Sequence, residues 1–292
     1  MDFLVADILA KQTNFYFFKI GRFSGKMTKA LMTIHGFLTD VNDFGRLYDY
    51  ALDYDEIVPF VVPGHAGKGD FSKFTVDATI KALLSCYDDL AKRHKQIDVA
   101  GFSMGGALAT YLCTKRDVHK VVLLAPANKY FNVTSGFSAI RFYLNFLRKV
   151  SKTTKGKLPE RYDAIMKAIA EHKANVDASA AILINRFLPN LTLHTFGVFV
   201  NLISMINKTV EASKTIATPA YVLWGKLDEL VPRSSVDYVC KFFSDCQTKI
   251  YEDIGHTMLY TNRDDVIIKD VLCFLSDGQV DVEIPSRLAT NK

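Results

Sequence analysis

The 292-residue sequence has few cysteines, and their positions follow no regular pattern. There are five, an odd number, scattered at Cys86, Cys113, Cys240, Cys246 and Cys273. A disulfide-rich secreted domain or a structural zinc site needs cysteines in even sets or short, closely spaced motifs. Because most of these five lie within apolar helical patterns, we expect reduced, buried thiols in a cytosolic protein.

Long uninterrupted apolar runs are also missing. The longest apolar region, residues 191–206, is broken by His194, Asn201 and Ser204, and is too short and too polar for a membrane span. The first residues, from Met1 to Asp7, are acidic where a secretory signal peptide would be basic. We therefore predict a cytoplasmic protein and expect no membrane contact.

The chain has little excess of charge of either sign, with a net charge of +5. Part of this excess comes from one basic stretch, residues 148–157, which contains Arg148, Lys149, Lys152, Lys155 and Lys157. We interpret the stretch as a solvated basic surface, because isolated charge runs in folded proteins are mostly solvent-exposed. No nucleic-acid partner is expected.

With 49% hydrophobic residues, the chain can bury one large core, or one core with an inserted subdomain. Short apolar runs alternate with helical patterns, which is typical of an α/β protein with a mostly parallel sheet between helices. The predicted strands are residues 15–19, 30–35, 56–62, 97–102, 120–125, 220–224 and 248–251. The predicted helices are residues 75–94, 105–115, 234–243 and 264–275.

The alternation stops after Pro126 and resumes at Thr218. The intervening region lacks a recognisable buried strand and shows helical patterns at residues 137–150, 160–173 and 178–187. An all-helical insertion between two strands of a sheet is best interpreted as a cap over the edge of that sheet. We predict a core of residues 1–127 and 214–292, with a helical cap, or lid, of residues 128–213.

One pentapeptide, residues 101–105 (Gly-Phe-Ser-Met-Gly), has the surroundings of a nucleophile elbow. A predicted strand precedes it and a predicted helix follows it. A serine in such a strand-to-helix turn lies on strained backbone, which presents its hydroxyl at the edge of the sheet. Residues two places before and after it must be small, because side chains there would collide across the turn. Ser103 is therefore the candidate nucleophile.

A serine hydroxyl becomes a good nucleophile when a base takes its proton and an acid orients that base. His256 is the candidate base among seven histidines, because it follows the last predicted strand and precedes the last predicted helix. Asp228, on the loop after strand 220–224, is the candidate acid, and Glu229 is its nearest competitor. The resulting order of serine, acid and histidine is typical of this type of site.

Acyl transfer also needs hydrogen-bond donors for the developing oxyanion. The backbone N–H of Met104, directly after the serine, is one candidate. The N–H of Phe37 is the other, because it follows the strand at residues 30–35. We expect Gly36 to let the chain turn sharply there and His35 to order the loop rather than take part in the chemistry.

These motifs resemble the α/β-hydrolase family in order and spacing over nearly the whole chain. They are residues 35–37, residues 63–67 (Pro-Gly-His-Ala-Gly), residues 101–106, the Asp228 loop and residues 255–256. The elbow Gly-x-Ser-Met-Gly-Gly and the loop Pro-Gly-His-x-Gly look like the carboxylesterase and monoacylglycerol lipase branch. The resemblance implies an α/β-hydrolase fold, a helical cap after the sixth canonical strand, and a serine hydrolase with no metal or organic cofactor. Two departures are an oxyanion loop without the second glycine of many relatives, and an insertion longer than a minimal lid.

The predicted activity is hydrolysis of a small-molecule carboxylic ester, a short to medium acyl ester or a monoacylglycerol-like lipid, through an acyl-enzyme. An aminopeptidase on the same triad is an alternative, but it would need clustered carboxylates in the cap to hold the substrate amine. The acidic residues there are spread out, at Glu160, Asp163, Glu171 and Asp177. A C–C bond hydrolase and a non-catalytic ligand-binding protein are further alternatives. The last class usually lacks a triad member, whereas this chain has all three.

Overall fold

The computed structural model describes residues 28–37, 39–65, 70–129, 193–210, 215–228, 230–279 and 283–286. Six parallel strands form one sheet in the order β2-β1-β3-β4-β5-β6. Their bounds are β1 Lys29–Ile34, β2 Glu56–Phe60, β3 Gln96–Phe102, β4 Lys120–Leu124, β5 Ala220–Gly225 and β6 Cys246–Tyr251. The strand predicted at residues 15–19 and the three helices predicted between residues 137 and 187 lie outside the described residues.

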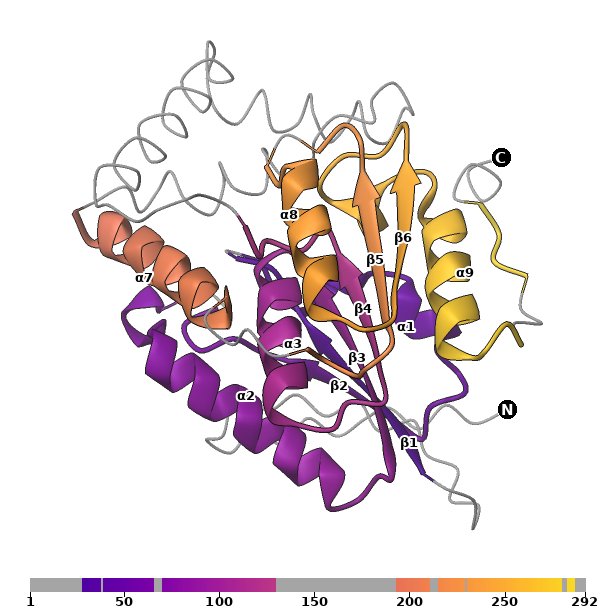
Figure 1. The fold of residues 1–292 in the computed structure, drawn as a ribbon, viewed down its shortest axis with the longest axis horizontal. Coiled ribbons are helices and arrows are strands. Elements are labelled where there is room, and N and C mark those ends of the chain that lie inside the picture. Colours follow the sequence, from indigo (N-terminus) through magenta and orange to yellow (C-terminus); the bar gives the residue numbers. More distant parts are fainter. Residues whose placement is uncertain are drawn as a thin grey trace, which may run out of the picture.

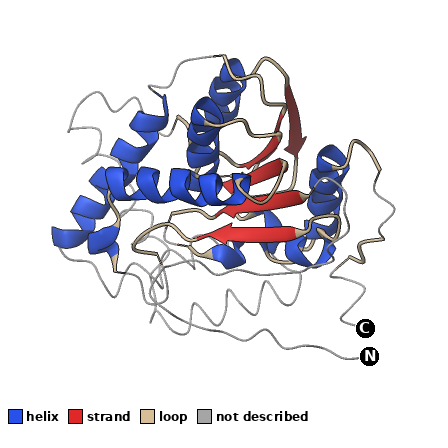
Figure 2. Ribbon diagram, turned by 90° about the horizontal axis from the view of Figure 1, so that it is seen from below, coloured by secondary structure: helices blue, strands red, loops and turns tan. Residues whose placement is uncertain are grey.

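Helices cover both faces of the sheet (Figure 1), and Figure 2 shows the strands between them in a second view. The α-helices are α1 Leu47–Tyr50, α2 Val76–Ala91, α3 Met104–Lys115, α7 Leu193–Val210, α8 Arg233–Val239 and α9 Asp264–Leu275. Short 3-10 helices are η1 Val41–Phe44, η2 Phe71–Lys73, η4 Cys240–Phe242 and η5 Met258–Tyr260. In Figure 1, α2, α3 and α8 lie on one side of the sheet, and α1 and α9 lie on the other. The predicted α/β class with a mostly parallel sheet is confirmed, and the helix predicted at residues 234–243 is divided into α8 and η4.

The strands from β1 to β5 are largely buried because both faces of the sheet are covered, whereas the edge strand β6 is mostly exposed. In β4, Val121, Val122 and Leu123 are all completely buried, as expected for a central parallel strand. β2 lies at the edge of the described sheet and contains Pro59. A proline has no N–H to donate to a neighbouring strand, so an edge strand tolerates it.

The sheet is wound in two directions from β1, which pairs with β2 on one side and with β3 on the other. Such a reversal of strand order opens a crevice at the carboxyl ends of the strands, where α/β proteins bind ligands. Ile34, the last residue of β1, pairs with Gly101 of β3. The loop that begins at His35 and the turn that holds Ser103 therefore start from neighbouring positions at this edge.

The helix after Ser103 is almost entirely enclosed. Residues from Met104 to Cys113 are all buried, because α3 lies between the sheet and the helices α2 and α7. α7 belongs to the region predicted as the cap, and its buried residues Leu202, Met205 and Ile206 join the main core. No helix among the described residues is both long enough and apolar enough to cross a membrane.

One prediction about the cysteines is wrong. Cys240 and Cys246 form a disulfide, with their Cα atoms 5.6 Å apart. The chain turns back at η4 before entering β6, and this local reversal brings two cysteines with no recognisable motif within bonding reach. Cys273 is exposed, whereas Cys86 and Cys113 are buried thiols as expected. With this disulfide, the cysteines no longer indicate a cytosolic protein, and a cytoplasmic location stays a prediction.

Candidate active site

Ser103 occupies a strained turn between β3 and α3. Its backbone has a φ of 53° and a ψ of −116°, a conformation that non-glycine residues rarely adopt. Its N–H donates to the carbonyl oxygen of Leu124 at 2.9 Å, and its carbonyl accepts from the N–H of Ala127 at 3.0 Å. Both bonds join the turn to the carboxyl end of β4, so the neighbouring strand stabilises the strained backbone conformation of Ser103.

The residues two places before and after the serine must be small, as predicted. A Cβ atom added to Gly101 would lie 2.4 Å from the carbonyl oxygen of Gly105. One added to Gly105 would lie 1.9 Å from the carbonyl oxygen of Ile34 in β1. Both distances are far below van der Waals contact with rigid backbone, so the elbow tolerates only glycine at these two positions.

The structure brings the predicted serine, histidine and aspartate into one hydrogen-bonded chain. The Oγ atom of Ser103 lies 3.0 Å from Nε2 of His256, and Nδ1 of His256 lies 2.8 Å from Oδ2 of Asp228. A carboxylate only accepts, so Nδ1 carries the proton and Nε2 is left to accept from the serine hydroxyl. The side chains of His256 and Asp228 are 6% and 0% exposed, and the ring of Phe102 packs beside the imidazole at 5.0 Å.

The second oxygen of Asp228 also accepts hydrogen bonds. Its Oδ1 atom accepts the backbone N–H groups of Leu230 and Val231, both at 2.8 Å. These bonds hold the carboxylate in one orientation, with Oδ2 directed at His256. The competing acid, Glu229, lies outside the described residues.

The two predicted oxyanion donors follow β1 and β3 at the same edge. Met104 is the first residue of α3, where backbone N–H groups have no partner within the helix. Phe37 follows Gly36 in the loop after β1. Gly36 is not among the glycines with positive φ; an added Cβ would instead lie 3.1 Å from the ring of Phe102. Close packing against Phe102 therefore favours a glycine here, and the expected sharp turn stays a prediction.

His35 orders the loop, as predicted. It is 1% exposed, and its Nε2 atom accepts the backbone N–H of Val62 at 3.0 Å. Since Nε2 is an acceptor, Nδ1 carries the proton and donates to the carbonyl oxygen of Gly36 at 2.8 Å. His35 thereby joins the loop after β1 to the segment after β2.

Asp43, in η1, is a residue of the site that no sequence pattern indicated. Its carboxyl is buried, and its Oδ2 atom accepts the N–H of Gly36 at 2.8 Å and the hydroxyl of Thr39. Burial raises the pKa of Asp43 to about 7, while these hydrogen bonds and the nearby His256 act in the opposite direction. No periodicity or motif marks this residue, because its role depends on the folded path of the loop.

A cluster of rings borders the oxyanion loop. Measured between ring centroids, Phe37 lies 5.9 Å from His65 and 5.7 Å from Phe74. His65 contacts Phe74 edge-on, with 4.9 Å between the ring centroids. The cluster is tied to α7, because the amide of Asn201 donates to the carbonyl oxygen of Phe74 at 2.7 Å. The cluster is tightly packed, with His65 2% and Phe74 0% exposed, and it lies beside the loop that carries one candidate oxyanion donor.

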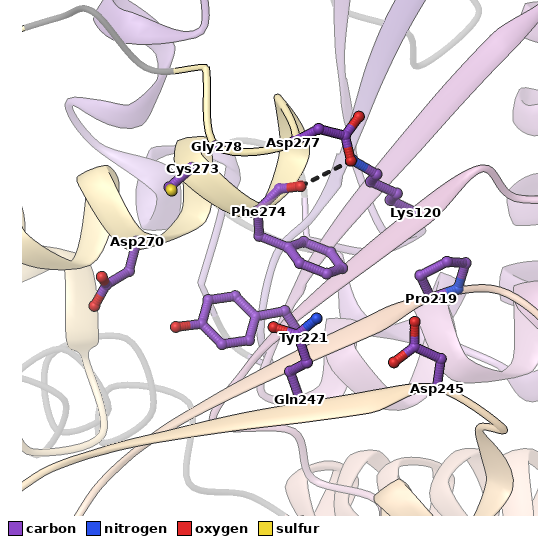
Figure 3. Close-up of a pocket in the computed structure, with 10 residues that line it drawn as sticks. All are labelled: Lys120, Pro219, Tyr221, Asp245, Gln247, Asp270, Cys273, Phe274, Asp277 and Gly278. Carbon is purple, nitrogen blue, oxygen red and sulfur yellow. Dashed lines mark hydrogen bonds and ion pairs between the residues drawn. The ribbon is translucent and has the colours of Figure 1, made fainter.

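A cavity of about 390 Å³ lies elsewhere, between β5, β6 and α9. It is lined by Lys120, Pro219, Tyr221, Asp245, Gln247, Asp270, Cys273, Phe274, Asp277 and Gly278 (Figure 3). These positions include the first residue of β4 and the start of β5, so the cavity lies at the opposite end of the strands from Ser103. Lys120 is already engaged there, since its Nζ donates to the carbonyl of Phe274 at 2.9 Å and to Asp277 at 2.6 Å. The cavity is therefore separate from the candidate active site.

The parallel sheet, its strand order and the strained serine between β3 and α3 define the class of the protein as an α/β hydrolase. A sequence profile described as serine aminopeptidase, S33 matches residues 28–263. The chain belongs to this family.

Distant relatives and solved structures agree with the class. Monoacylglycerol lipase ABHD6 of Homo sapiens is 20% identical over 238 residues, covering 79% of this chain and 70% of the relative. An α/β hydrolase, MGS-M2, from a Medee basin deep-sea metagenome library has a TM-score of 0.64 at 13% identity, covering 92% of this chain and 97% of that structure. The esterase EaEST from Exiguobacterium antarcticum has a TM-score of 0.63 at 15% identity, covering 90% and 95%. At these identities the structural neighbours show the fold alone.

Proposed function

We propose that the protein is a carboxylic ester hydrolase in which Ser103, His256 and Asp228 form the catalytic triad. The observation that carries this proposal is the chain of hydrogen bonds from Ser103 Oγ through His256 to Asp228, at 3.0 and 2.8 Å. Nδ1 of His256 already donates to the carboxylate, so Nε2 is in the form that takes a proton from the serine.

In the first half of the reaction, Ser103 Oγ attacks the ester carbonyl carbon while its proton passes to Nε2 of His256. Collapse of the tetrahedral intermediate breaks the bond to the leaving alkoxide, which takes the proton from His256 and departs as an alcohol. In the second half, water gives a proton to His256 and attacks the acyl-enzyme, which releases the carboxylic acid and restores Ser103. Asp228 stabilises the imidazolium in both halves and keeps its charge throughout.

The amides of Phe37 and Met104 are the proposed oxyanion donors. The N–H of Met104 stands at the amino end of α3, where the helix dipole favours negative charge. The loop that contains Phe37 begins directly after Ile34, the residue of β1 that pairs with Gly101 of β3. Two such donors lower the energy of the intermediate most where water is excluded.

An apolar acyl ester is the proposed substrate class. The half-buried ring of Phe37 on the oxyanion loop supports it, because apolar side chains at a site favour acyl chains over charged substrates. The monoacylglycerol lipases among the relatives support the same class at low identity. The helical cap of residues 128–213 is part of this proposal, as the element that would complete the acyl pocket.

An aminopeptidase is the second candidate, favoured by the description of the matching family. It would use the same triad on an amide bond and would need a carboxylate to hold the substrate amine. The four acids considered for that role in the sequence lie outside the described residues.

A substrate panel tests the proposal. p-Nitrophenyl esters of increasing acyl length and a monoacylglycerol would be compared with aminoacyl p-nitroanilides, with the Ser103→Ala protein as the blank. The proposal expects Ser103-dependent turnover of esters with an optimum in acyl length. Turnover of the anilides alone would favour the aminopeptidase. A folded protein with no Ser103-dependent turnover in the panel would refute the ester hydrolase.

A further inference from the structure

We propose that Asp43 is a positioning residue for the oxyanion hole, and that its buried carboxyl fixes the direction in which the Phe37 amide points. The inference rests on the proposed function, because it concerns how one oxyanion donor is held. Asp43 does not touch the reacting atoms and acts through the backbone of Gly36.

Two side chains hold the two peptide units on either side of Gly36. The preceding unit contains the N–H of Gly36, which donates to Oδ2 of Asp43 at 2.8 Å. The following unit contains the carbonyl of Gly36, which accepts from Nδ1 of His35 at 2.8 Å. Both groups are buried, with Asp43 5% and His35 1% exposed. Each peptide unit is thus anchored separately.

The second of these units also contains the N–H of Phe37. A trans peptide is planar, so this N–H points opposite to the carbonyl of Gly36. Only the φ and ψ angles of Gly36 separate the two units, and glycine restricts those angles less than any other residue. The anchor at Asp43 is therefore needed to remove the freedom that Gly36 introduces, because His35 alone holds only one side.

Asp43 also ties down the part of the loop beyond Phe37. The hydroxyl of Thr39 donates to the same Oδ2 atom that accepts from Gly36. One oxygen atom therefore joins positions before and after the candidate donor. Asp43 itself lies in η1, where the Asp40 side chain accepts the N–H of Asn42 and stabilises the start of the helix.

The geometry separates the acceptor role of Asp43 from its charge. Because both donors use Oδ2, an asparagine with its oxygen at that position would keep both bonds without a negative charge. An alanine would remove both bonds and leave the N–H of Gly36 without its acceptor. Asp53 is exposed on the same connection between β1 and β2, so Asp53→Ala is a control for the loss of one acidic side chain.

The experiment compares kcat and KM for a p-nitrophenyl ester in the parent, Asp43→Ala, Asp43→Asn and Asp53→Ala proteins, with folding checked by thermal unfolding. Removal of a whole oxyanion donor costs about 100- to 1,000-fold in kcat, so a misdirected donor should cost about 10- to 100-fold. We expect Asp43→Ala to lose kcat in that range with KM nearly unchanged. A boronic acid forms a tetrahedral adduct that occupies the oxyanion hole. Its affinity for the Asp43→Ala protein should be lower than its affinity for the parent by a similar factor. Asp43→Asn should recover most of the lost kcat, and Asp53→Ala should match the parent.

Three results would overturn the inference: parental kcat in Asp43→Ala, an Asp43→Asn protein as impaired as Asp43→Ala, or an equal loss in Asp53→Ala. Failure of the proposed function is recognised separately, by a parent protein without Ser103-dependent turnover. Amide hydrogen exchange at Gly36 then decides the role of Asp43. Exchange should be slow in the parent and in Asp43→Asn and faster in Asp43→Ala, and equal rates would refute the anchor.

Discussion

Replacing Asp43 by asparagine should raise the free energy of unfolding at high pH, and this gain should become smaller as the pH falls. Burial raises the pKa of this carboxyl from 3.8 to about 7. The folded protein therefore retains a proton between about pH 4 and 7 that the unfolded chain releases. Since the folded state binds more protons over that range, the free energy of unfolding falls as the pH rises through it. Asparagine is uncharged at every pH and lacks this dependence.

The size of the effect follows from the pKa shift. A shift of one unit corresponds to about 1.4 kcal/mol, so the raised pKa lowers the free energy of unfolding by about 2 kcal/mol at pH 5, where folded Asp43 keeps its proton, and by about 4 kcal/mol at pH 8, where it is ionised. The groups that act on it include Asp40, which raises its pKa, and His256, which lowers it. Tyr48 lies nearby with a pKa raised by burial, so its phenol stays neutral over this range. Burial therefore outweighs the hydrogen bonds from Thr39 and Gly36, which lower the pKa of Asp43.

Urea unfolding of the parent and Asp43→Asn proteins at pH 5, 6, 7 and 8 measures this effect. The stability difference in favour of Asp43→Asn should widen by roughly 2 to 3 kcal/mol from pH 5 to pH 8. Asp53→Asn, at an exposed site, should show a difference that is nearly constant with pH. A constant difference for Asp43→Asn as well would refute the reasoning, because it would mean that Asp43 ionises in the folded protein as it does in water.

Two further predictions concern the triad and the elbow. Asp228→Asn should lower kcat by about 10⁴-fold in the proposed triad, because the amide favours the wrong tautomer of His256. Steady-state kinetics measures this, and near-normal turnover would favour Glu229 as the acid. Gly105→Ala should unfold or strongly destabilise the protein, because its Cβ would lie 1.9 Å from the carbonyl oxygen of Ile34. The matched control is Gly197→Ala in α7, where an added Cβ meets nothing within 4 Å. Thermal unfolding should show stabilisation of about 0.5 to 1 kcal/mol for that control, and equal effects of the two changes would contradict the steric argument.

Much of the sheet could be predicted because its strands are short, apolar and separated by helical patterns. β3 and α3 are the clearest case, because the glycines at 101 and 105 mark the turn between a strand pattern and a helix pattern. The same local pattern identified Ser103. His256 and Asp228 followed from their order along the chain, because parallel strands bring the loops at their carboxyl ends to one edge.

Features that depend on the path of the chain between elements could not be predicted. Asp43 looks like an ordinary acidic loop residue, and only the folded loop places it against the N–H of Gly36. The disulfide between Cys240 and Cys246 depends on a local reversal of the chain at η4. The helical periodicity of the sequence predicted one longer helix over this region and gave no sign of the reversal. The missing strand pattern between Pro126 and Thr218 predicted a cap, but it does not reveal that α7 packs on α2 and α3.

The proposed mechanism requires that Ser103 forms an acyl-enzyme. Rapid quenching of the protein with a p-nitrophenyl acyl ester, followed by mass spectrometry of its peptides, tests this most directly. We expect an added acyl group on the peptide that contains Ser103, formed together with a burst of p-nitrophenol, and neither of these in the Ser103→Ala protein. An acyl group on another residue, or equal turnover by the Ser103→Ala protein, would contradict it.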